Sequence, residues 1–180
     1  DEVDWMDDET RQEAKAKADA ISTYIGYPDE LLNDTLIEEL YSGLDLKRAQ
    51  YFDNILHLRK WSTDYSFRQL RKPNLKVDWR KHARAATVNA FYNSLDNSIE
   101  FPAGILQGAF FDKYKPNYLN FGAIGFVIGH EITHGFDDRG RQFDKEGNNR
   151  NWWNSDTDQR FKERAQCIID QYSNYTVPEN

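Results

Sequence analysis

The sequence contains a single cysteine, Cys167, so no disulfide bond can form within its 180 residues. A lone cysteine favours a buried thiol in a reducing compartment. Two glycosylation sequons favour the alternative, an extracellular protein in which Cys167 has a partner outside this sequence. They are Asn33-Asp34-Thr35 and Asn174-Tyr175-Thr176. The sequence alone leaves both interpretations open.

Long hydrophobic runs are missing too. No apolar stretch approaches the roughly 18 uncharged residues of a membrane-spanning helix, and the first residues have no signal-peptide pattern. Basic residues are the minority, because 23 lysines and arginines face 30 aspartates and glutamates, and the net charge is -7. This charge disfavours nucleic acid and anionic membrane surfaces as partners. The chain starts and stops abruptly, so we expect it to be a segment of a longer protein.

Apolar residues make up 39% of the sequence and aromatic residues 14%, which is enough for the core of one domain and argues against disorder. Helical periodicity and cap residues predict helices over residues 10–25, 29–41, 45–60 and 62–70, and a last helix that opens at 155–158. We interpret these helices as scaffold and their charged residues as solvated faces.

The character of the sequence changes after Pro73. Residues 87–92 and 98–101 favour strands, and the turn formers at 93–97 predict that they form a hairpin with a free edge. Residues 101–107 leave this hairpin as an apolar loop. Its side chains, like those of Phe110 and Phe111, either fill the core or form the wall of a pocket, and the two alternatives stay open.

The most specific pattern lies in the apolar stretch 119–138, where His130-Glu131-Ile132-Thr133-His134 has the form H-E-x-x-H. On a helix, positions four apart share one face and lie about 6 Å apart along the axis, so both imidazoles can reach one metal ion at about 2.0–2.1 Å. Glu131 lies about 100° around the helix, where it can take a proton from a water on the metal. The pattern predicts a zinc-peptidase site rather than two solvated histidines.

A catalytic zinc takes three protein ligands, and the third is not evident here. Glu163 is the only glutamate well placed within the last helix, and Glu179 lies at the very end of the chain. Neither has a supporting pattern. His57 and His82 lack ligand-like spacing, and we interpret both as structural.

The residues around the motif narrow the class. The metzincin pattern needs a glycine at position 137 and a histidine at 140, and the sequence has Asp137 and Gly140 there. Asp138, four residues after His134, could hold its imidazole by a hydrogen bond, with Asp137 as the alternative. Three glycines fall on one side of the helix that leads into the motif: Gly122, Gly125 and Gly129. They predict that another backbone packs closely against this side.

Longer segments add to this motif and run colinearly through almost the whole chain. They are DWMDDET (4–10), IGYPDE (25–30), VNAFYNS (88–94), IEFPAGILQ (99–107), FF (110–111), LNFGAIGFVIGHEITHGFDDRGRQFD (119–144) and NWW (151–153). With these segments the sequence closely resembles the neprilysin-type zinc metalloendopeptidases, and in particular the C-terminal half of their extracellular part.

The resemblance implies an α+β, predominantly helical fold, with a thermolysin-like zinc-peptidase core and a small antiparallel edge sheet in an incomplete domain. Residues 1–75 are then a helical segment that links to, or belongs to, a companion helical domain, and residues 76–180 are the N-terminal part of the catalytic domain. In this family the third zinc ligand is the glutamate of an E-N-x-x-D motif on a later helix, so it is expected downstream of Asn180. Cys167 matches a cysteine that pairs with one near the family's C-terminus.

The resemblance also implies roles for individual residues. His130 and His134 are expected to bind one Zn²⁺ ion per active site, and Glu131 to act as the general base. The expected substrates are oligopeptides, cleaved on the amino side of large hydrophobic residues. The residues expected to bind them are Asn89, Ala90, Ile105, Phe110, Phe111, Phe126 and Val127.

Members of this family are glycosylated and extracellular, either secreted or held in the plasma membrane by one N-terminal helix. Membrane contact is therefore expected only through an anchor outside this chain, and the isolated 180 residues are expected to be inactive. The alternative is a catalytically inactive, neprilysin-like binding or scaffold protein. The intact Glu131 speaks against it, because a decayed enzyme has no chemical need for that carboxylate.

Overall fold

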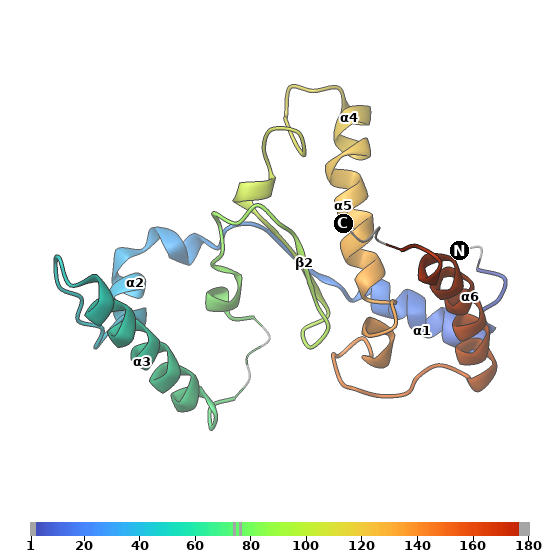
Figure 1. Cartoon of the computed structure of the whole chain (residues 1–180), viewed down its shortest axis with the longest axis horizontal. Coiled ribbons are helices and arrows are strands. Elements are labelled where there is room, and N and C mark those ends of the chain that lie inside the picture. Colours follow the sequence, from blue (N-terminus) through green and yellow to red (C-terminus); the bar gives the residue numbers. More distant parts are fainter. Residues whose placement is uncertain (1–2, 74, 76, 177–180) are drawn as a thin grey trace.

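A computed structural model describes residues 3–73, 75 and 77–176 and shows helices arranged around one small sheet (Figure 1). The α+β, predominantly helical class is confirmed. The α-helices are α1 (Asp8–Asp19), α2 (Asp34–Leu40), α3 (Tyr51–Gln69), α4 (Asn117–Gly122), α5 (Ile124–His134) and α6 (Ser155–Ser173). The strands are β1 (Ser22–Gly26), β2 (Phe91–Asn93) and β3 (Ser98–Pro102). Four short 3-10 helices complete the described elements: η1 (Asp29–Leu32), η2 (Trp79–His82), η3 (Ala103–Ile105) and η4 (Gly140–Gln142).

The sheet has the order β1-β3-β2. Strands β2 and β3 form the predicted antiparallel hairpin, but β1 pairs with β3 in parallel, so the sheet is mixed rather than antiparallel. The prediction of a helix over residues 10–25 was wrong in its last turn, because α1 ends at Asp19 and β1 follows. β-Branched and aromatic residues dominate that turn, and pairing with β3 gives their backbone the partners that a helix would have supplied.

The boundaries of other helices also differ from those that the hydrophobic periodicity predicts. The two helices predicted over 45–60 and 62–70 are one helix, α3. The helix predicted over 29–41 is divided into η1 and α2, and the side chain of Asn33 caps α2 by accepting the N–H groups of Thr35 and Leu36. The central apolar helix is interrupted at Ala123, whose φ of -98° and ψ of -86° separate α4 from α5.

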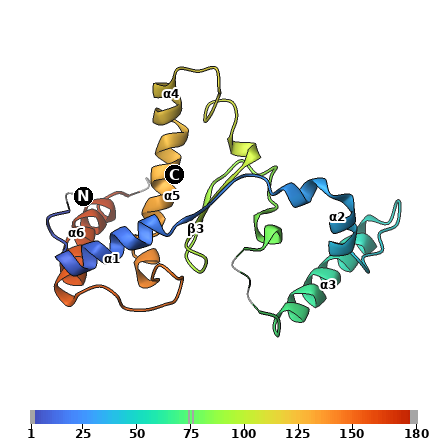
Figure 2. The ribbon, with the colours of Figure 1, turned by 180° about the vertical axis from the view of Figure 1, so that it is seen from behind.

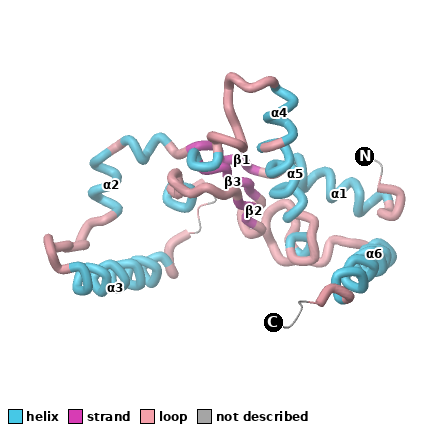
Figure 3. The backbone as a smooth tube through the Cα atoms, turned by 45° about the horizontal axis from the view of Figure 1, so that its top comes forward, coloured by secondary structure: helices cyan, strands magenta, loops and turns pink. Residues whose placement is uncertain are grey.

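The elements form a row rather than a ball (Figures 1 and 2). The strands lie in the middle, with α2 and α3 on one side and α1, α5 and α6 on the other (Figure 3). Strand β1 belongs to the expected N-terminal part of the chain, yet it pairs with β3 of the expected catalytic part. The division of the chain near residue 75 stays a prediction.

The main core lies between the sheet and α5. Its buried members are Ala90, Ile99, Phe101, Ile105 and Ile124. A second apolar contact joins the start of the chain to α6, where the ring of Trp5 lies 6.1 Å from that of Trp153 and 6.3 Å from that of Phe161. The first contact holds α5, which carries the motif His130–His134, against the sheet, and the second holds α6 against the start of the chain.

Candidate metal centre and active site

Helix α5 carries His130 and His134 on one face, one turn apart, at its C-terminal end. The Nε2 atoms of the two imidazoles lie 3.0 Å apart, and the ring planes meet at 86°. Both rings are exposed to solvent. The two nitrogen atoms therefore converge on a single point outside the helix.

The orientation of His134 is set by the loop that follows α5. Its Nδ1 lies 2.8 Å from Oδ2 of Asp137. The other carboxylate oxygen, Oδ1, accepts the backbone N–H groups of Arg139 (3.0 Å) and Gly140 (2.7 Å). Of the two alternatives that the sequence left open, Asp137 rather than Asp138 makes the contact. A carboxylate at Nδ1 holds the proton there and leaves the lone pair of Nε2 free for a cation.

Glu131 lies between the two histidines in sequence but on the buried side of the helix. Its side chain is buried, with a relative exposure of 5%. Burial raises the pKa of the Glu131 carboxyl above its usual range, while the nearby His134 and His130 act in the opposite direction. A carboxylate with a raised pKa accepts a proton more readily than an exposed one, as a general base requires.

The donor set of this site fits zinc in kind and in spacing, but it is incomplete within the described residues. Two imidazole nitrogens bound to zinc at about 2.0–2.1 Å in tetrahedral geometry are roughly 3.3 Å apart, close to the observed 3.0 Å. Among residues 3–73, 75 and 77–176, no group of three or more metal-binding side chains comes together. The two histidines thus supply part of a site.

The glutamates considered for the third ligand do not complete it. Glu163 lies on α6 beside Cys167, accepts a hydrogen bond of 3.0 Å from Gln159 and, within the described residues, does not join the two histidines in a metal-binding group. The sequence shows on which face of a helix a residue lies, but not where that helix packs in the fold. Glu179 lies outside the described residues. His82 is buried against Glu100, with 3.3 Å from Nδ1 to Oε2, and His57 is exposed near Asp45. Within the described residues, neither joins His130 and His134 in a group of three or more metal-binding side chains.

A groove of about 1110 Å³ runs past the two histidines. One wall is the β2 strand with the two residues before it, and the other is the end of α5 with the loop that follows. Strand β2 is hydrogen-bonded to β3 on one side only, so its other edge is open toward the groove. The lining residues used below are Asn89, Ala90, His130, Glu131, His134 and Asp137.

The other residues expected to bind substrate lie elsewhere. Ile105 is a buried core residue, and Phe111 and Val127 pack against the same core. Phe110 and Phe126 are exposed, with 38% and 72% of their surface free. None of the five lines the groove beside the histidines, so the structure brings together only Asn89 and Ala90 from the expected set.

Two further expectations concern the glycines of the central helix and Cys167. A methyl group added at Gly122 or Gly129 would meet no atom within 4 Å, and one at Gly125 would meet only Asn120 and Phe121 of the preceding helical turn, so the described chain supplies no distant backbone at this face. The predicted close packing there stays a prediction. Cys167 is exposed, which rules out the buried-thiol interpretation for the described structure. No helix in the described ranges combines the length and apolar character needed to cross a membrane.

Lys17 was missed by the sequence analysis, which treated the charges of α1 as solvated. Its side chain is buried, and its ammonium group contacts the loop after α5. Nothing in the sequence marks this residue, because its acceptors are backbone carbonyl groups.

Paired imidazoles on one helix, a buried glutamate between them and an open strand edge beside them are the arrangement typical of metallopeptidases. Comparison with known proteins identifies the family. The model of peptidase family M13 matches residues 89–180. The chain belongs to this family.

Similar proteins share nearly the whole chain. Neprilysin-2 of Drosophila melanogaster is 57% identical over 176 residues, which cover 98% of this chain and 23% of that protein. Human neprilysin is 47% identical over 177 residues, with the same two coverages of 98% and 23%. A crystal structure of the Mycobacterium tuberculosis zinc metalloprotease ZMP1 in complex with an inhibitor matches with a TM-score of 0.85 and 38% identity, covering 98% of this chain and 25% of that one. The chain thus spans about a quarter of the length of these relatives.

Proposed function

We propose that this chain is the metal-binding part of a zinc-dependent metalloendopeptidase that hydrolyses oligopeptides. The observation that carries the proposal is the convergence of His130 and His134 on one point, with 3.0 Å between their Nε2 atoms and Glu131 beside them. Bound there, zinc would supply Lewis-acid activation of the scissile carbonyl group and of the attacking water.

The protein's own residues have distinct roles in this proposal. Asp137 holds the proton of His134 on Nδ1 and so fixes the tautomer and orientation of the imidazole. Glu131 takes a proton from the attacking water as the new C–O bond forms, and delivers it to the amine nitrogen as the C–N bond breaks. Its buried position keeps the carboxylate close to the helix and out of bulk water.

The open edge of β2 is the proposed binding site for the peptide backbone. An extended peptide that adds to this edge gains main-chain hydrogen bonds and passes directly in front of the histidines. Asn89 and Ala90 stand at the start of this edge, in the groove. Asn89 already accepts the backbone N–H of Ala90 at 2.9 Å, which leaves its side-chain amide group to donate to a substrate carbonyl.

Cleavage on the amino side of large hydrophobic residues is proposed from the family resemblance. Phe110 and Phe126 offer exposed aromatic surface. The three other residues assigned to this pocket, Ile105, Phe111 and Val127, would support its wall from within.

The location and completeness of the protein are also proposals. We propose an extracellular, glycosylated protein, secreted or anchored through an N-terminal helix outside this chain, with a third zinc ligand and a partner of Cys167 supplied from outside it as well. Asn33 and Asn174 are both exposed, as glycosylation would require. The 180 residues on their own are proposed to be inactive.

Hydrolysis of a fluorogenic peptide with a central Phe or Leu, by the full-length protein, tests the function. We expect activity that a chelator removes and Zn²⁺ restores. Glu131→Gln should keep zinc bound and lower turnover by about 10²–10⁴-fold or more, while Glu163→Gln on α6, as the matched control, should be unchanged. Zinc binding without any hydrolysis by the wild type would instead favour the inactive binding protein.

A further inference from the structure

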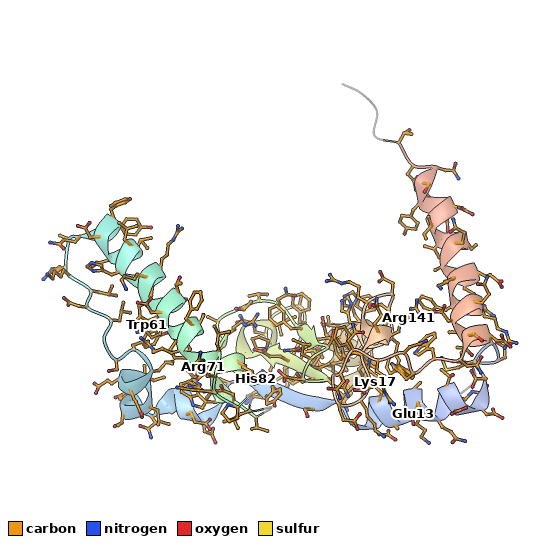
Figure 4. All side chains as sticks on the ribbon, turned by 90° about the horizontal axis from the view of Figure 1, so that it is seen from below. Glu13, Lys17, Trp61, Arg71, His82 and Arg141 are labelled. Carbon is orange, nitrogen blue, oxygen red and sulfur yellow. The ribbon has the colours of Figure 1, made fainter. Side chains whose placement is uncertain are left out.

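Lys17 is a buried cation on the last turn of α1, and only 1% of its surface is exposed. Its Nζ donates hydrogen bonds to three backbone carbonyl oxygens, those of Gly135 (2.6 Å), Gly140 (2.7 Å) and Phe143 (2.6 Å). An ammonium group has three N–H donors, so all of them are used. Figure 4 shows Lys17 where α1 meets the crowded side chains at the centre of the molecule.

The three acceptors all belong to the segment that follows the metal-binding helix. Gly135 is the first residue after α5, Gly140 begins η4, and Phe143 follows η4. The single ammonium group therefore gathers three points of one loop. Burial of a charge is unfavourable unless it is fully hydrogen-bonded. Burial lowers the pKa of the Lys17 ammonium group to about 8, and the charges of Asp144 and Asp137 oppose this shift.

A series of hydrogen bonds, linked through the backbone of Gly140, leads from Lys17 to the candidate ligand His134. Lys17 holds the carbonyl oxygen of Gly140, and the N–H of Gly140 is held at 2.7 Å by Oδ1 of Asp137. Oδ2 of the same carboxylate contacts Nδ1 of His134 at 2.8 Å. Movement of the loop at Gly140 would therefore move the carboxylate that orients the imidazole.

Helix α1, from which the Lys17 side chain extends, is itself held by hydrogen bonds. The backbone carbonyl of Lys17 accepts a hydrogen bond of 3.1 Å from the side chain of Asn97. At the other end of α1, Asp7 accepts a hydrogen bond of 2.6 Å from the hydroxyl of Thr157 on α6. Helix α1 is thus held at both ends, so the Lys17 ammonium group holds the loop from a fixed backbone position.

We infer that Lys17 is a positioning residue of the metal centre: through the loop at residues 135–143 it holds Asp137, and thereby His134, in the orientation that binds the metal. This inference rests on the proposed zinc site. Lys17 touches neither metal nor substrate, so its effect must pass through Asp137. That requirement separates the inference from a purely structural role.

A double-mutant cycle on zinc affinity tests it, with the full-length protein and a chromophoric chelator as competitor for Zn²⁺. Lys17→Met keeps the apolar stem and removes the donors, and should weaken zinc binding about 10-fold, at the lower end of the range for residues that orient metal ligands. Asp137→Asn keeps an acceptor for the two N–H groups and loses the carboxylate at His134. In that background, Lys17→Met should change zinc affinity less than about 2-fold, because the route is already broken.

The controls separate the possible failures. Thr157→Val loosens the far end of α1 without touching the loop, and its zinc affinity should stay within about 2-fold of the wild type. Thermal melts establish which variants are folded, and Lys17→Gln, which keeps two donors, replaces Lys17→Met if the latter does not fold. An equal loss from Lys17→Met in both backgrounds, or no loss in either, overturns the inference while the zinc site stands. A wild-type protein that binds no zinc overturns the proposed function and this inference with it.

Discussion

The side-chain amide of Asn97 donates a hydrogen bond of 3.1 Å to the backbone carbonyl of Lys17, and this contact joins the β2–β3 turn to the end of α1. The same amide group lies 3.3 Å from the carbonyl oxygen of Lys145, and the Asn97 side-chain oxygen accepts the hydroxyl of Tyr92 at 2.9 Å. Only 1% of Asn97 is exposed. A turn residue therefore connects three segments that are far apart in the sequence.

Replacement of Asn97 should destabilise this junction strongly. Asn97→Ala removes the side-chain partners of two carbonyl groups and one hydroxyl group in a buried place, and we expect the free energy of unfolding to fall by about 2–4 kcal/mol. Its φ of +45° also favours asparagine over alanine. Asn97→Gly accepts this φ without making the hydrogen bonds, so chemical denaturation of both variants separates the two causes. If glycine restores wild-type stability, backbone strain rather than hydrogen bonding is the reason.

Gly140 should not tolerate a side chain. A methyl group there would lie 1.8 Å from the carbonyl oxygen of His134, at the end of α5. Gly140→Ala should therefore displace the loop, lower the free energy of unfolding by about 1–3 kcal/mol and weaken zinc binding. Gly108→Ala is the control for stability loss without a clash, because Gly108 has a φ of +60° and open space around it. Zinc titration of the two variants decides, and equal affinities would contradict a role for the close contact at Gly140.

Much of the site was predictable, and the parts that were not share a cause. The helical spacing of His130 and His134 is local, so the sequence was enough to predict their convergence, and the β2–β3 hairpin follows from alternating residues around a turn. Strand β1 was missed because its five residues have no clear alternation, and their pairing with the distant strand β3 makes them a strand. Lys17 was missed because backbone carbonyl groups, its only hydrogen-bond acceptors in the described chain, leave no trace in a sequence.

The stability that the contact between α1 and α6 contributes should depend on pH. Hydrogen bonds from the backbone of Thr10 and the hydroxyl of Thr157 lower the pKa of Asp7 from 3.8 to about 2. Because the folded pKa lies below the unfolded one, the stability that this carboxylate contributes is present above about pH 4 and is lost as the pH falls toward 2.

Asp7→Asn should therefore lower the free energy of unfolding by roughly 1–2 kcal/mol at pH 6, through loss of the charge that the hydrogen bonds stabilise, and the difference from the wild type should shrink between pH 4 and pH 2. Asp8→Asn is the matched control, because the contact of Asp8 within the described residues is an exposed ion pair with Arg11, and the change should have little effect. Denaturation curves over this pH range give the answer. A difference for Asp7→Asn that does not change with pH would contradict the role of its charge.

Cys167 should report whether the protein is extracellular. Its side chain is exposed beside Trp5 and Arg164, so a free thiol would react readily with an alkylating reagent. In the native full-length protein we expect no labelling at Cys167 until a reductant is added, because a partner outside this chain would hold it in a disulfide. Mass spectrometry of the alkylated peptide measures this. Labelling without reductant would count against the proposed location.

Residues 1–180 on their own should bind zinc weakly. Within the part of the chain that the structure describes, the candidate site offers two imidazoles, and neither a carboxylate nor a third nitrogen joins them. Structural zinc sites in small peptides reach apparent binding free energies of about 10–16 kcal/mol with four ligands in place, and two ligands should give a dissociation constant of about 1 µM or weaker. Calorimetric titration of the isolated chain with Zn²⁺ measures this value, and His134→Ala should abolish what binding remains. Tight one-to-one binding that depends on His134 would mean that a third ligand lies within these residues, and Glu179→Gln would then be the first variant to test.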